Sequence, residues 1–510
     1  MKGNKTKVLE SVSFLKTEEN IFQLFDKIGV KNFKNQNDYY TGFKFDLPVS
    51  SINTYWNRFE NGLMDLSSVF VSFLDTEKRL EAANPPTNIS LTQEAAKHPI
   101  HFMQRDDSIE MQFSKYFSQA FGEDLIVHRN AGSKVPLYVG KRPIIKDGED
   151  RVSTSYITKL EELDLLHEQG DGMRSFVGVM LYAFISFYSI LLIDEPEAFL
   201  HPPQAKLLGK MISNDIPKGR QVFISTHSEE FIQGLLDPDN DKIKIIRINR
   251  HENINHISVL DSDEISKIWN DSLLRHSNVF SGLFHQKVVI CEADSDCRFY
   301  NAMMTSYYEE TGQQQPSVLF IHCGGKHRIP VVIEALIKLN VDVRVIVDFD
   351  ILNNQHPIEE IFSLLGGDWN AVSSMFKIVK SQIEHKRPAL LTADLNAKIT
   401  EIFSRTNETN MPTNKINEIN GLLKKSSVWG EAKVSGKTYI PSGTASQAFE
   451  DMQTVFKQHH LFILEIGELE CFIKQVGNHG PKWVSEVLDR YPLSNQIFEP
   501  AKAFIKTVLA

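Results

Sequence analysis

The sequence is poor in cysteine, and its net charge is not positive. Its 510 residues include four cysteines, Cys291, Cys297, Cys323 and Cys471, which form no CxxC pair and no disulfide ladder. A reducing cytoplasm is therefore the expected location. The formal net charge of −10 excludes a protein that coats nucleic acid through bulk positive charge, but it is compatible with an enzyme that holds phosphates with local lysines and metal ions. The opening residues Met1–Lys5 lack the apolar core of a signal peptide.

Long hydrophobic runs are also scarce. One run, Ser175–Ile193, holds nineteen residues without a formal charge, nearly the length of a membrane-spanning helix. It is followed at once by Asp194, and its last residues, 189–193, are typical of a buried strand. Since central parallel strands are apolar on both faces, we interpret the run as a core helix followed by such a strand, and we expect no membrane contact.

Helical and strand-like patterns alternate along the chain, which predicts α/β domains with mainly parallel sheets. One series runs to about residue 280, and a second begins at the apolar strand Lys287–Cys291. We therefore predict one domain over residues 1–280 and another over 281–510, with a polar insertion near 385–425. The expected strands are 189–193, 221–225, 242–249, 287–291, 317–322, 343–347 and 461–464.

Two stretches have the composition of loops. Residues 85–155 contain turn-forming clusters such as Asp147-Gly148-Glu149-Asp150, so this stretch is predicted to be rich in loops. The Asn- and Thr-rich segment 405–420 has little apolar content, and we predict an exposed insertion or a flexible loop there.

Two carboxylates follow the strand 189–193, at the end of an α/β sheet where ligands bind. Asp194 can hold magnesium through water, and Glu195 can polarise an attacking water. The next strand, 221–225, ends close to His227, which can contact a γ-phosphate. The alternative is that the two acids form an ordinary solvated turn.

Upstream of these acids, the segment Gln169–Ser175 opens a helix whose backbone N–H groups face an anion. Gly170, Gly172 and Ser175 are therefore candidates for nucleotide binding. No GxxxxGK[ST] phosphate loop occurs in the sequence, so the expected P-loop is incomplete. Near the start, Lys5 and Thr6 resemble the end of such a loop, but Asn4 stands where the motif has glycine, and the preceding strand and first glycine are missing. The alternative for this segment is a basic chain end without a role.

A second set of carboxylates follows two strands of the second series. The strand 287–291 ends in Glu292, and Asp296 follows shortly after. The strand 343–347 ends in Asp348 and Asp350, alternate residues that can direct two carboxylates toward one cation. Mg²⁺ and Mn²⁺ prefer such oxygen ligands.

The order of a glycine-rich helix start, DEPEAFLHP and STHS resembles the ABC-type ATPases of the structural-maintenance and OLD (overcoming lysogenization defect) families. This resemblance implies that Gln169–Ser175 is the signature loop, which reaches the ATP of a dimer partner. It also implies that Asp194 and Glu195 form the Walker B motif, that Ala198–His201 is the D-loop and that His227 is the switch histidine.

The order of Glu292, the turn Gly324-Gly325-Lys326 and DFD resembles the TOPRIM domain of topoisomerases, primases and OLD nucleases, a Rossmann-like fold with a mainly parallel sheet. Ala293 replaces the glycine usual in the opening motif. The OLD type carries further acids for a second metal, for which Glu468 and Glu470 are the candidates, and Lys482 is the candidate cation near the scissile phosphate. Two metals can activate water and stabilise the leaving oxygen.

An ABC-type ATPase domain followed by a TOPRIM domain resembles the OLD-family nucleases, including Gabija-type and retron-associated anti-phage effectors. The resemblance implies an endonuclease or nickase that depends on Mg²⁺ or Mn²⁺, acts on DNA and is gated by an ATP-binding head that forms a homodimer or higher oligomer. A reverse transcriptase or a helicase is the implied partner protein. Lys433 and Lys437 are among the basic residues that can contact phosphates.

Two alternatives from other classes stay open. The first is a nucleotide-sensing scaffold whose TOPRIM acids are structural. The second is a DNA-repair ATPase without nuclease activity, although that class inserts long coiled coils and the sequence has no sustained heptads. A transporter ATPase would leave the second domain without an explanation.

Overall fold

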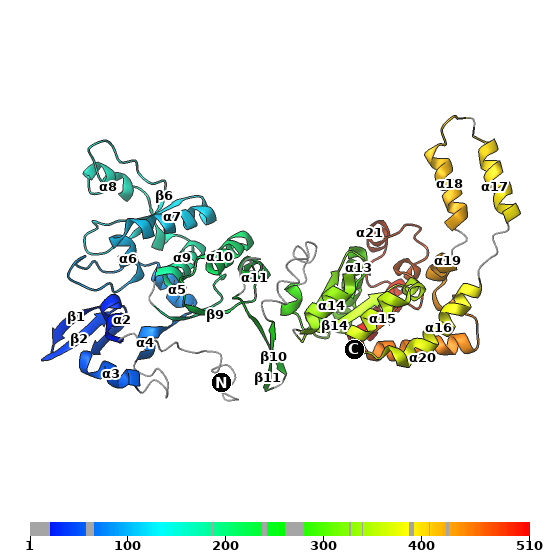
Figure 1. Ribbon diagram of the computed structural model, residues 1–510. Helices are drawn as coiled ribbons and strands as arrows, with labels where there is room; N and C mark the ends of the chain where they lie inside the picture. The colour runs from blue at the N-terminus through cyan, green and yellow to red at the C-terminus, as the bar shows by residue number, and fades with distance from the viewer. Residues whose placement is uncertain are drawn as a thin grey trace. The chain divides into compact units, whose positions relative to one another are not determined.

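The computed structural model divides into two compact units, Met1–Asn240 and Asp241–Ala510 (Figure 1). Both units are α/β, as the sequence predicts. The division falls before residue 281, because the hairpin of β10 (Ile245–His251) and β11 (Ile254–Leu260) belongs to the second unit. The structure describes residues 21–57, 66–185, 188–236, 242–251, 253–260, 280–325, 328–338, 340–386, 392–406, 408–424 and 428–510.

Arg247 of the hairpin makes hydrogen bonds with the rest of the second unit. Arg247 donates from Nε to the carbonyl of Leu283 at 3.0 Å, and its Nη2 donates to the carbonyl of His285 at 3.0 Å. Its Nη1 also reaches the carbonyl of Asn340 at 2.6 Å. The predicted strand 242–249 is confirmed over residues 245–249, but it belongs to the second unit rather than to the first.

The central sheet of the first unit is parallel, in the order β4 (Val71–Leu74), β8 (Ile190–Asp194), β9 (Gln221–Ser225). Its middle strand, β8, follows α9 (Asp171–Met180) and a π-helical turn, Leu181–Ile185, both of which are largely buried. The core helix and parallel strand predicted from the apolar run are thus confirmed. Among the described residues, no helix is both long and apolar enough to span a membrane.

The other sheets of the first unit are antiparallel, and they lie where the sequence suggested loops or gave no motif. The prediction of a loop-rich stretch over 85–155 is correct for residues 85–98, 128–136 and 141–153, which belong to no helix or strand, but two helices and two strands lie between them. Its helix α7 carries Phe113 and Phe117 four residues apart on one buried face, a helical pattern that the flanking turn residues obscured. The elements are β1 (Gly29–Lys34), β2 (Asn37–Gly42), β3 (Phe45–Pro48), α6 (Pro99–Arg105), α7 (Asp107–Phe121), β5 (Asp124–Val127), β6 (Leu137–Gly140) and β7 (Asp164–Leu165).

The second unit contains a parallel sheet in the order β13-β12-β14-β15. Four of the predicted strands are thereby confirmed, with their ends shifted by at most one residue. The strands are β12 (Lys287–Cys291), β13 (Val318–His322), β14 (Asp342–Val347) and β15 (Leu461–Ile463). The helices that flank them include α13 (Asp294–Thr311), α14 (Ile329–Lys338), α15 (Gln355–Leu364), α16 (Trp369–His385), α19 (Val428–Ser435), α20 (Thr444–Gln458), α21 (Pro481–Arg490) and α22 (Glu499–Leu509).

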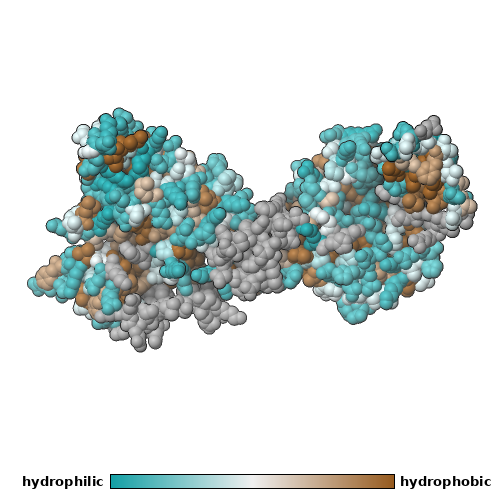
Figure 2. Space-filling model, turned by 45° about the horizontal axis from the view of Figure 1, so that its top comes forward, coloured by the Kyte–Doolittle hydropathy of each residue, from teal (hydrophilic) through white to brown (hydrophobic). Residues whose placement is uncertain are grey.

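The polar insertion forms a helical hairpin of α17 (Thr392–Ser404) and α18 (Thr413–Lys424) (Figure 1). The prediction of an exposed insertion over 405–420 is correct, but much of that segment is helix α18 rather than a loop. Apolar side chains gather over this part of the surface (Figure 2). Phe403, Ile416 and Leu423 are among them, with exposed fractions of 51%, 44% and 47%.

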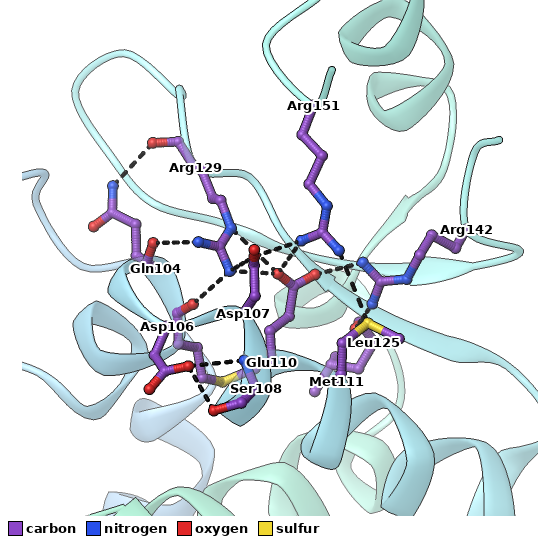
Figure 3. Close-up of polar contacts among 11 residues, drawn as sticks. Gln104, Asp106, Asp107, Ser108, Glu110, Met111, Leu125, Arg129, Arg142 and Arg151 are labelled. Atoms are coloured by element: carbon purple, nitrogen blue, oxygen red, sulfur yellow. Dashed lines mark hydrogen bonds and ion pairs between the residues drawn. The ribbon is translucent and has the colours of Figure 1, made fainter. Parts of the chain in front are cut away.

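A buried carboxylate organises the middle of the first unit (Figure 3). Glu110 of α7 is fully buried, and three arginines pair with it: Arg142 at 2.6 Å, Arg151 at 2.7 Å and Arg129 at 2.8 Å. Arg129 also donates to the carbonyl of Gln104 at 3.0 Å. Because these arginines come from segments that follow β5 and β6, one side chain fixes three stretches of backbone to α7.

We expect Glu110→Gln to lower the free energy of unfolding by about 3 kcal/mol or more, because it removes the fully buried charge that three partly buried guanidinium groups share. Asp107→Asn is the matched control, since Asp107 contacts Arg129 and Arg151 but is 69% exposed. The control should cost less than about 1 kcal/mol. Denaturant unfolding measures both, and equal losses would contradict this account of Glu110.

Candidate functional site

Three predicted metal ligands converge at the ends of β12 and β14. Glu292 follows β12, Asp348 follows β14, and Asp350 lies in the 3₁₀ turn Phe349–Asn353. Their ligand oxygens lie within 4.8 Å of one another. Phe349 is buried between the two aspartates, so both carboxylates are left on the side of Glu292. The Glu292 carboxylate also accepts the backbone N–H of Asp348 at 3.0 Å, which holds the two strand ends together.

A second group contains both predicted glutamates and a histidine. Ligand atoms of Glu468, Glu470 and His479 lie within 4.8 Å of one another. The glutamates were predicted from the sequence, but His479, which lies in a separate loop before α21, was not. Gly480 brings that loop to the site, because its N–H donates to the Glu470 carboxylate at 2.7 Å. Its φ of 58° is a left-handed conformation that glycine adopts without strain.

Asp296 lies in the first turn of α13, outside both of these groups. Its carboxylate accepts the backbone N–H of Ala293 at 3.0 Å. Burial raises the pKa of Asp296 to about 6, and the charges of Glu292 and Glu470 add to the rise. Ala293 has φ −133° and ψ 161°, an extended conformation open to any residue, so alanine fits where the resembling motif has glycine.

Lys433 lies between the two groups of carboxylates. Its Nζ is 2.9 Å from Asp348 Oδ2 and 3.8 Å from Glu468 Oε2. Although burial lowers the pKa of Lys433, the carboxylates of Asp348, Asp350 and Glu468 raise it well above its usual value. The structure therefore places the ammonium group of Lys433 at the point where the two groups meet.

Two glycines allow α19 to bring Lys433 this close. A Cβ on Gly467 would lie 2.0 Å from the carbonyl oxygen of Lys433, and a Cβ on Gly436 would lie 2.2 Å from that of Glu465. Both glycines have positive φ, 118° and 57°. The backbone that follows β15 thus packs directly against α19, which the sequence alone did not indicate.

Lys482, the lysine named from the sequence, lies elsewhere. It is exposed on α21, where it lines an open surface hollow with Asn478, Ser485 and Glu486. The turn Gly324-Gly325 has φ of 70° and 125°, values that favour glycine, and Lys326 lies outside the described residues. Of the two described candidates, Lys433 and Lys482, it is Lys433 that contacts the carboxylates.

The donors of both groups suit a divalent cation. Burial raises the pKa of Asp348, Glu292 adds to the rise, and Lys433 opposes it. Burial likewise raises the pKa of Glu468, and the charge of Glu470 adds to it. Carboxylates that are crowded in this way are stabilised by a cation, and the oxygen-rich set is the one that hard divalent ions prefer.

The nucleotide motifs of the first unit also converge. Asp194 ends β8, and the hydroxyl of Ser225, at the end of β9, donates to its carboxylate. Glu195 Oε1 lies 3.2 Å from His227 Nδ1, so the predicted catalytic pair is in contact. Glu195 has a φ of 45°, a rare backbone conformation for a non-glycine residue that turns the chain sharply at the end of β8.

Glu197 holds the backbone of His227 and the neighbouring Thr226 in place through hydrogen bonds. It is buried, and its Oε1 accepts from Thr226 Oγ1 at 2.6 Å and from the backbone N–H of His227 at 3.2 Å. No role was predicted for Glu197, because its position two residues after Glu195 does not indicate that its side chain is buried.

The start of α9 is packed against the segment Ala198–His201, which follows the acids at the end of β8. Gly170 caps this helix, and a Cβ on Gly172 would lie 2.8 Å from the carbonyl oxygen of Phe199. Ser175 is fully buried, and its Oγ accepts from Arg79 Nε at 3.1 Å. Of these candidates for nucleotide contact, Ser175 therefore faces the protein interior. Lys5 and Thr6 lie outside the described residues.

Arg79 connects these pieces. It is fully buried in α5 (Thr76–Ala82) and binds the backbone carbonyl of Asp194 as well as Ser175. Burial lowers its pKa, while the charges of Glu197, Asp194 and Glu195 oppose that shift. The arginine thus links the signature-like helix to the strand end that carries the acids. No sequence pattern singled it out.

Comparison with protein families gives two matches. Residues 70–233 match the model of an AAA domain, described as putative AbiEii toxin of a type IV toxin–antitoxin system. Residues 283–350 match the TOPRIM domain of overcoming-lysogenization-defect-like proteins. The uncharacterized protein MJECL11 of Methanocaldococcus jannaschii is 36% identical over 69 residues, which are 13% of this chain and 60% of that protein.

Solved structures show a weaker likeness. One, from a study of ATP-driven dimerization and DNA-stimulated activation of SMC ATPases, is 15% identical over 34% of this chain and 96% of its own, with a TM-score of 0.23. The Smc head of Pyrococcus furiosus with an extended coiled coil, bound to the C-terminal domain of ScpA, is 14% identical over 34% of this chain and 39% of its own, with a TM-score of 0.25.

The two family models match in the order that the motifs indicated, and each includes acids described above. Asp194, Glu195 and His227 lie within the first match, and Glu292, Asp348 and Asp350 lie within the second. This chain therefore carries an AAA-type ATPase domain followed by a TOPRIM domain of the overcoming-lysogenization-defect-like type.

Proposed function

We propose that this chain is a DNA endonuclease or nickase that depends on Mg²⁺ or Mn²⁺ and is controlled by its ATPase domain. The observation that carries the proposal is the convergence of Glu292, Asp348 and Asp350 on one point beside Lys433. Strand ends of a parallel sheet supply these acids, so their positions are fixed by the fold rather than by mobile loops.

The residues of the second unit divide the work. Glu292, Asp348 and Asp350 would hold one divalent cation, and Glu468 with Glu470 would help to hold another. When bound, such cations supply Lewis-acid stabilisation of a phosphodiester under attack. Lys433 can pair with a phosphate oxygen, because its ammonium group already lies beside the proposed metal ligands. A bound phosphate would take the place of one of the carboxylate oxygens that it now contacts.

The first unit supplies the control. Glu195 can orient a water, and His227 can contact the terminal phosphate of a nucleotide. Arg79 donates hydrogen bonds to both the Asp194 carbonyl and Ser175. A movement of the backbone at the end of β8 would therefore displace the first turns of α9 through this side chain. We infer a homodimeric or larger assembly in which this helix start contacts the partner's nucleotide.

We infer the biological role from the combination of the two domains. A TOPRIM nuclease under ATPase control suits a cytoplasmic anti-phage effector, which must stay inactive until infection, and a reverse transcriptase or a helicase would be its partner protein. One observation favours the scaffold alternative: Lys433 neutralises part of the acid group without a metal. Cleavage experiments with metal decide between the two.

We expect the purified chain to nick supercoiled plasmid in the presence of Mg²⁺ or Mn²⁺, and Asp348→Asn to abolish nicking, because the amide removes a charge from the first acid group. Gel electrophoresis of the plasmid measures both. Cleavage by the Asp348→Asn chain at the rate of the unmodified chain would remove the nuclease assignment.

The two candidate lysines can be separated in the same assay. Lys433→Met should lower the nicking rate at least about tenfold, since it removes a charge that contacts Asp348. Lys482→Met should have a smaller effect because Lys482 is exposed on the outer face of α21. The reverse order of effects would return the catalytic role to Lys482.

The raised pKa of Asp296 predicts a pH dependence of stability. The folded protein holds this proton up to about pH 6, whereas the unfolded chain releases it near pH 4. In EDTA, stability should therefore fall as pH rises between these values, by at most about 3 kcal/mol. Asp296→Asn should remove the fall and raise the melting temperature at pH 8, with no gain at pH 4. Asp294→Asn is the control, because Asp294 is 51% exposed and pairs with Arg298. Parallel pH profiles for the Asp296→Asn and unmodified chains would contradict this reading.

For the first unit, Glu195→Gln should slow ATP hydrolysis at least about a hundredfold, as expected when a general base is lost. Glu123→Gln, which changes an exposed glutamate outside the site, is the control and should hydrolyse ATP at the unmodified rate. Phosphate release measures turnover. Equal rates in all three proteins would show that Glu195 has no role in hydrolysis.

A further inference from the structure

The group Glu468, Glu470 and His479 differs in chemistry from the first acid group. We propose that it is a mixed nitrogen–oxygen metal site in which His479 is a ligand, and that it binds Mn²⁺ in preference to Mg²⁺. This inference rests on the proposed metal-dependent nuclease and deepens it by assigning different cation preferences to the two sites.

The spacing of the three side chains fits one cation. His479 Nδ1 lies 3.5 Å from Glu470 Oε1 and 4.0 Å from Glu468 Oε1. Ligands about 2.1 Å from an octahedral cation are about 3.0 Å apart when adjacent and about 4.2 Å apart when opposite. Both measured separations lie in this interval, so small side-chain movements suffice to place the three atoms around one ion.

Independent segments bring the nitrogen and the oxygens together. The glutamates flank Leu469 after β15, and their side chains are 12% and 16% exposed. His479 comes from the loop before α21 and is 75% exposed, so it covers the glutamates from the solvent side. The bond from Gly480 N–H to Glu470 fixes the loop at this point. The glutamates are thus held in place, and the histidine can adjust to an ion.

The nitrogen decides which ion is preferred. Mg²⁺ selects oxygen ligands and keeps much of its water, whereas imidazole favours transition metals. Mn²⁺ is a transition metal that binds carboxylates and also accepts an imidazole, so of the two candidate ions it is the one that this ligand set favours. The first acid group, Glu292, Asp348 and Asp350, offers oxygen atoms alone and suits either Mg²⁺ or Mn²⁺.

His479 has another reading, in which its protonated ring is only an ion-pair partner of the glutamates. The two readings differ in one observable, because a ligand nitrogen couples magnetically to bound Mn²⁺ and a protonated ring in an ion pair does not.

The test uses the full chain, stripped of metal and loaded with MnCl₂, and measures the electron spin-echo modulation from ¹⁴N. Coupling should be present in the unmodified chain and in His356→Gln, and absent in His479→Gln. His356 is the matched control, since it is 84% exposed and its ring lies 3.7 Å from Glu360. Coupling that persists in His479→Gln, or that is missing from the unmodified chain, would overturn the proposal.

Calorimetric titration gives a second readout. His479→Gln should weaken Mn²⁺ binding at one site at least about tenfold, while Mg²⁺ binding changes less than about twofold. An equal loss for both ions would overturn the assigned preference. Plasmid nicking tests the nuclease assignment separately from this proposal. Nicking without ¹⁴N coupling would support the nuclease and contradict the histidine ligand. Coupling without nicking would support the histidine ligand and contradict the nuclease.

Discussion

Carboxylates gathered at the ends of parallel strands are the constraint on which both units depend. The carboxylates of one such set repel one another and lose solvation when they are buried. The fold must therefore supply a positively charged side chain nearby or leave room for a metal cation. In the first unit Arg79 is buried close to Asp194 and Glu197. In the second unit Lys433 reaches Asp348 and Glu468. Each cation comes from a helix outside the strands that carry the acids, so each ties a helix to a strand end.

This arrangement explains what the sequence could and could not predict. The acids follow apolar strands directly, and the end of a parallel strand is a local feature that spacing reveals, so Asp194, Glu292 and Asp348 were found. Lys433 lies 85 positions after Asp348, and it reaches the site because Gly436 and Gly467 let two backbones touch. Local patterns contain no information about such contacts, and one exposed-looking lysine, Lys482, was an equally good candidate.

The same limit applies to Ser175 and to the loop-rich stretch. A glycine-rich helix start predicts N–H groups that face an anion, but the pattern does not say which way the second turn points, and Ser175 points to Arg79. In the stretch over 85–155, turn residues mark the ends of elements and hide the helix between them. Its buried glutamate, Glu110, gave no signal, because three of its partners come from later segments.

The acids of the second unit and the lysine that compensates them lie on different elements of the fold. The strand ends fix Glu292, Asp348 and Asp350 rigidly, while Lys433 arrives on α19, directly after the helical hairpin of α17 and α18. Since Lys433 is among the charges that compensate these acids, a displacement of α19 changes the electrostatics of the site without moving its ligands.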